Sequence, residues 1–140
     1  MKTILLCSGI LFLIVYASSA ADQNVGLHGE QLSLLQKQCT KSAAEFYQRW
    51  RSCEGERDYK NHYNTKRNIC FITISAHCRG PQDGVLWVET LFDANDNTQY
   101  GRYLCDGELI DDKPAQCYVG ANRCESLDEF RELIKPYMED

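Results

Sequence analysis

The residues with the clearest chemical potential in this chain are its eight cysteines, whose oxidation would close the chain with disulfide bonds. One of them, Cys7, lies in the apolar segment 4–17, which follows a basic start and precedes small residues ending at Ala20. This order is typical of a secretory signal peptide at residues 1–20. Its removal would leave seven cysteines in residues 21–140, which we interpret as a single exported domain in an oxidising compartment.

Position predicts two disulfide pairs. Cys117 and Cys124 flank a short segment with Gly120 at its middle, so a tight hairpin would bring the two cysteines opposite each other. Cys39 lies on the apolar side of a predicted helix and Cys70 on the apolar side of a predicted strand, which favours a Cys39–Cys70 bridge. Because the mature count is odd, one thiol is left over, and it could join a second chain into a dimer.

The spacing of the remaining reactive residues predicts no catalytic residue, no metal ligand and no cofactor. The chain has no Cys-x-x-Cys pair, which thioredoxin-type redox sites and zinc ribbons require. Asp93, Asn95 and Asn97 match the first ligand positions of an EF-hand loop, but Thr98 replaces its glycine and Leu104 its bidentate glutamate. An ordinary turn is therefore favoured over a calcium site.

An acidic segment is the best candidate for contact with a partner. We expect the carboxylates of this segment to dock on a basic protein or peptide. The alternative is that the segment is a loop whose charges only increase solubility. The formal net charge of −5 becomes −6 once Lys2 is lost with the leader, which disfavours nucleic acid and anionic membranes. No second apolar stretch approaches the length of a membrane helix, so we expect no membrane insertion after cleavage. The candidate partner-binding residues are Asp106, Glu108, Asp111 and Asp112.

Hydrophobic periodicity predicts the elements that position these residues. Apolar residues at steps of three and four predict a helix from Leu32 to Trp50, and 54–67 reads as a polar connection with a short extended piece near its middle. Alternation then predicts an antiparallel set of strands, and a turn across Gly120 joins the last two. The predicted strands are 70–78, 85–92, 99–105, 116–119 and 122–124.

A capping box at 126–129 begins a short final helix whose apolar face starts at Leu127 and ends at Tyr137. The predicted fold class is therefore α+β: an N-terminal helix, an antiparallel sheet of three or more strands and a short C-terminal helix, stabilised by disulfides. In such a domain we expect both helices to pack on one face of the sheet.

Several segments together resemble a pattern of uncharacterised exported bacterial proteins. The segments are QCTKSAAEFYQRW, HYNTKRNICFITIS, ETLFDANDNTQYGRYL and CYVGANRCESLDEFRELIKPYM. The resemblance implies a bacterial domain in the periplasm or the medium and carries no established activity. We expect a non-catalytic binding or inhibitory module; a small secreted hydrolase and a structural envelope component are the alternatives.

Overall fold

The fold is an antiparallel sheet with a helix before it and a helix after it. A computed structural model describes residues 20–51, 55–79, 84–107 and 113–140. The described residues 20–32 belong to one unit, and those from Ser33 onward belong to a second, which contains the whole sheet and the C-terminal helix. The elements are α1 (Ala20–Arg49), β1 (Arg57–Asn64), β2 (Ile69–Arg79), β3 (Val85–Asp93), β4 (Gln99–Asp106), β5 (Gln116–Val119), β6 (Asn122–Arg123) and α2 (Leu127–Met138).

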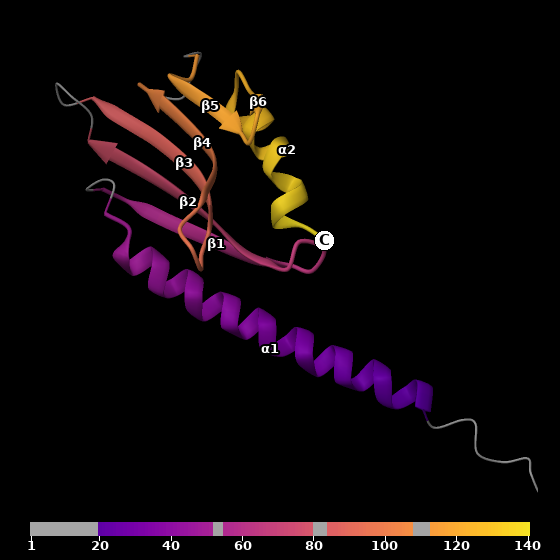
Figure 1. Ribbon diagram of the computed structural model, residues 1–140. Coiled ribbons are helices and arrows are strands. Elements are labelled where there is room, and N and C mark those ends of the chain that lie inside the picture. Colours follow the sequence, from indigo (N-terminus) through magenta and orange to yellow (C-terminus); the bar gives the residue numbers. More distant parts are fainter. Residues whose placement is uncertain (1–19, 52–54, 80–83, 108–112) are drawn as a thin grey trace, which may run out of the picture. The chain divides into compact units, whose positions relative to one another are not determined.

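The strands form a meander in which each strand pairs only with its neighbours in the sequence (Figure 1). The predicted turn at 93–97 is confirmed: the Asp93 carboxylate accepts the Asn95 backbone N–H at 2.8 Å, and Asn97 has a φ of 66°. Gly120, with a φ of 58°, makes the predicted turn between β5 and β6. These local turns explain why five of the six strands begin and end close to their predicted positions.

The two helices pack against opposite faces of the sheet, so the prediction that they share one face was wrong. Alternate residues of β2 divide between two cores, with Ile72 and Ile74 packed beside α1 and Phe71 packed beside α2. The segment from Ile69 to Ile74 is apolar on nearly every residue, so both of its sides need cover. We call the side packed against Phe130 the α2 face of the sheet.

Strand β1 replaces most of the predicted polar connection. It pairs with β2 over its whole length, from Arg57 opposite Ala76 to Asn64 opposite Ile69. The apolar signal is weak because β1 is an edge strand, which tolerates polar residues on both sides. Tyr59 and Tyr63 anchor it in the α1 core, and the Tyr59 ring lies 4.5 Å from that of Tyr47 between centroids.

Side-chain hydrogen bonds fix both ends of α2. The Ser126 hydroxyl accepts the Glu129 N–H at 3.1 Å, as the capping box predicted, whereas the Glu129 carboxylate accepts from Glu125. At the other end the side-chain amide of Asn64, which is 1% exposed, donates to three backbone carbonyls at 3.1 to 3.2 Å. The acceptors are the carbonyls of Pro136, Tyr137 and Glu139.

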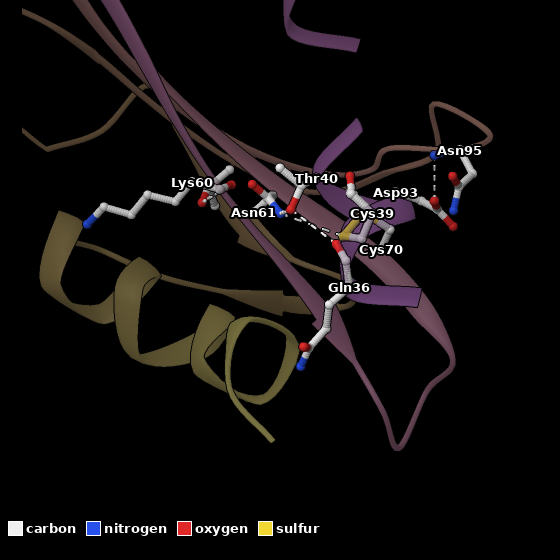
Figure 2. The surroundings of a disulfide bond; sticks show 9 residues. Gln36, Cys39, Thr40, Lys60, Asn61, Cys70, Asp93 and Asn95 are labelled. Atoms are coloured by element: carbon white, nitrogen blue, oxygen red, sulfur yellow. Dashed lines mark hydrogen bonds between the residues drawn. A yellow bond between two sulfur atoms is a disulfide. The ribbon is translucent and has the colours of Figure 1, made fainter. Parts of the chain in front are cut away.

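Both predicted disulfide pairs are confirmed. Cys39 and Cys70 join α1 to β2 with a Cα–Cα distance of 5.2 Å (Figure 2), and Cys117 and Cys124 join β5 to the segment before α2 at 5.0 Å. Cys78 is also disulfide-bonded.

Over the part of the chain that is described, no helix has the length and apolarity needed to cross a membrane.

Candidate functional site

A polar recess of about 300 Å³ lies on the α2 face, over the first three strands and beside α2. Strand residues supply most of its lining, and Arg131 comes from the helix. Apart from Tyr59, whose ring packs in the α1 core, the side chains are two carboxylates, two cations and two hydroxyls. The residues that line the recess are Asp58, Tyr59, Lys60, Thr73, Ser75, Glu89 and Arg131.

Strand register places these side chains in two rows across the sheet. Asp58 lies opposite Ser75, and Ser75 lies opposite Glu89. Lys60 lies opposite Thr73 in the next row. Because residues two apart on a strand point to the same face, both rows open on the α2 side.

Glu89 is the least expected member, because its carboxylate lies inside the fold. Its side chain is 7% exposed, and Oε2 pairs with Nη2 of Arg131 at 3.1 Å. Among the described residues this is the one hydrogen bond that the carboxylate accepts. Oε1 accepts none from them, and it is not sealed from solvent. A buried carboxylate is costly unless its oxygens are paired. Oε1 therefore offers an unfilled acceptor position in the recess.

The two cations also keep free donors. The Arg131 side chain is about half exposed (49%), and its bond to Glu89 uses one nitrogen of the guanidinium. Lys60 is exposed, and its side chain extends away from the Cys39–Cys70 disulfide (Figure 2). Lys60 forms no ion pair with any residue that the structure describes. The recess thus presents unpaired groups of both signs.

Tyr103 lies beside Glu89 on β4 and extends the polar row under α2. Burial raises the pKa of the Tyr103 phenol to about 12, and a hydrogen bond and the charge of Cys105 act in the same direction, while Arg131 opposes them. The phenol is therefore neutral at physiological pH. It leaves the charge of this row to Glu89 and its partners.

We expect the buried phenol to make the fold sensitive to alkali. Below pH 10 Tyr103 is protonated in both states; above it the unfolded chain ionises and the folded chain does not until about pH 12. Stability should therefore fall as pH rises through this range, and Tyr103→Phe should retain on the order of 1 kcal/mol more at about pH 11. Urea denaturation of the unsubstituted protein and of Tyr103→Phe at about pH 8 and pH 11 measures this difference in the free energy of unfolding. An identical pH dependence in the two proteins would contradict it.

The recess contains none of the partner-binding residues predicted from the sequence that the structure describes. Asp106 is exposed at the end of β4, while Glu108, Asp111 and Asp112 lie outside the described residues. Docking of a basic protein or peptide on them stays a prediction. Within the described ranges no group of three or more His, Cys, Asp or Glu side chains could hold a metal ion.

The sequence does contain signals for the two residues that were missed. Glu89 lies between Trp87 and Leu91 on one side of a largely apolar strand, and charged residues are rarely buried without a partner. Arg131 lies at the edge of the apolar stripe of α2, four residues after Leu127 and three before Ile134. These signals indicate that each charge needs a partner, but they do not identify that partner.

Comparison with known protein families, with curated proteins and with solved structures finds no match for this chain. The basis for a function is therefore the chemistry of its own residues.

Proposed function

We propose that this chain is a small exported bacterial protein that acts as a binding module, with the polar recess as its binding site. The leader pattern at residues 1–20 and the disulfide bonds support export to the periplasm or the medium. The resemblance of several segments to exported bacterial proteins supports a bacterial origin.

The observation that carries the proposal is the buried carboxylate of Glu89, whose Oε1 accepts no hydrogen bond from the described residues. A protein that needed this residue only to attach α2 would gain as much from an apolar side chain, since replacing a buried ion pair by well-packed apolar residues is often neutral or stabilising. A bound ligand with a hydrogen-bond donor would fill Oε1 and offset the cost of burial.

A hydrolase would need side chains that activate one another. Among the described residues of the recess no hydroxyl donates to a carboxylate, and Oδ1 of Asp58 accepts from the N–H of Tyr59. Without a nucleophile held by a base, the arrangement favours binding over covalent catalysis.

The test is a titration of the isotope-labelled mature protein, followed by NMR, with small polar compounds of four kinds: neutral sugars, cations, anions and zwitterions. Saturable shifts that centre on the amides of Ser75, Glu89 and Arg131 are expected for at least one kind. Glu89→Gln should weaken that ligand about tenfold or more, since a hydrogen bond to a charged group is worth roughly 1.5 to 3 kcal/mol.

The matched control is Glu132→Gln, which removes the same charge from the exposed side of α2, where Glu132 pairs with Lys135. Binding should be unchanged in this variant. If no compound shifts the recess saturably, or if both variants weaken binding equally, the recess is not the binding site.

A further inference from the structure

We propose that the ligand of the recess is a small zwitterion, a molecule the size of a free amino acid that carries both an ammonium and a carboxylate. This inference rests on the proposed function of the recess as a binding site. It is based on three groups that line one small volume and keep unused hydrogen-bonding positions: Oε1 of Glu89, the remaining N–H groups of Arg131 and the ammonium of Lys60.

The ammonium end fits the sheet side of the recess. Oε1 of Glu89 is an acceptor that no described residue fills, and Ser75 lies directly opposite Glu89 with its hydroxyl on the same face. An ammonium group has three donors, so it can bind the carboxylate and the hydroxyl together. A hydrogen bond between charged groups in a partly desolvated site is stronger than one between neutral groups.

The carboxylate end fits the cations at the edge of the recess. Arg131 keeps its N–H groups beyond Nη2 for a second acceptor, and a planar guanidinium holds carboxylates in a defined orientation. Lys60 lies on the neighbouring row and can turn its flexible side chain over the same ligand. Because Arg131 already binds Glu89, the two recognition groups are held near each other before the ligand arrives.

Ligands of a single charge fit the lining less well. A simple cation would meet Glu89 but also the like charges of Arg131 and Lys60, and a simple anion would meet Asp58 and Glu89. A zwitterion satisfies both signs without adding net charge to the recess. The volume of about 300 Å³ lies at the lower end of ligand-binding pockets, which limits the ligand to a small molecule.

The test compares one zwitterion with its two halves, using calorimetry and NMR on the mature protein. L-Serine carries both charges, ethanolamine lacks the carboxylate, and 3-hydroxypropionate lacks the ammonium. Glycine, alanine, asparagine and aspartate are included to cover other side chains. We expect at least one amino acid to bind at the recess, and the serine comparison to show affinity at least tenfold above either half.

Two variants separate the two ends of the ligand. Glu89→Gln should weaken both serine and ethanolamine, whereas Lys60→Gln should weaken serine and not weaken ethanolamine, whose like-charge repulsion it relieves. Lys135→Gln is the control for Lys60, because it removes a lysine that pairs with Glu132 outside the recess. Thermal denaturation checks that each variant folds, and Lys60 is exposed, so its substitution should not disturb the core.

The outcomes distinguish this inference from the proposed function. If a sugar or a singly charged compound binds the recess as well as or better than every amino acid, the inference of a zwitterionic ligand is wrong. The proposal that the recess is a binding site is then still supported. Equal effects of Lys60→Gln and Lys135→Gln would overturn the assignment of the carboxylate end. If nothing in either set of compounds binds the recess, both proposals fail.

Discussion

Replacing Cys39 and Cys70 together with alanine should lower the free energy of unfolding by about 3 to 4 kcal/mol. The bond closes a loop between residues 31 positions apart, and its loss gives that loop back its freedom in the unfolded chain. The loop includes β1, so the same bond limits the separation of α1 from the sheet edge. Urea denaturation followed by circular dichroism at neutral pH measures the change.

The second disulfide is the natural control for the first. Cys117 and Cys124 are 7 positions apart, so the same chain-entropy argument gives their removal a smaller cost of about 2 kcal/mol. A larger loss from the local bond than from the long one would contradict the entropic explanation. It would show that strain or packing at the two sites decides their contributions instead.

Asn64→Ala should cost about 3 kcal/mol, because it removes the donor to the three carbonyls at the end of α2. The side-chain oxygen Oδ1 of Asn64 also accepts the Arg67 backbone N–H at 3.0 Å, so the substitution removes a contact of the β1–β2 turn at the same time. For a domain of about 100 residues we expect a fall in Tm of more than 10 °C, measured by calorimetry.

Thr65→Val is the matched control for Asn64, since it lies next in the chain and its hydroxyl donates to Asp140 at an exposed site. Its effect should stay within about 0.5 kcal/mol. Hydrogen exchange should locate the damage of Asn64→Ala in the last turn of α2. Protection there equal to that of the unsubstituted protein would show that other contacts hold the helix end.

The elements that the sequence predicted are those whose signals are local. The alternation in β2, the turn at 93–97, the short loop between Cys117 and Cys124 and the cap at Ser126 all act within a few residues of each other. The edge strand was recognised only in part, because its polar residues gain their place from pairing with β2 and not from their own pattern.

The recess could not be predicted from such patterns, since its site joins Glu89 to a helix residue 42 positions later. From the sequence, the alternation in β2 places Ser75 and Thr73 on a solvent-exposed face of the strand, because nothing in that pattern shows that α2 covers this face. Which face a C-terminal helix covers depends on the whole set of packed side chains, so neither strand nor helix carries this information alone.

The order of the strands also favours a particular folding route. Each hairpin of the meander closes a short stretch of chain, and proteins rich in local contacts fold quickly. Disulfide formation takes seconds to hours, which is far slower than the assembly of such hairpins. We therefore expect the sheet to form and α1 to pack on it before the cysteines are oxidised, which places Cys39 beside Cys70, so that the native bond is made directly, without earlier wrong pairings.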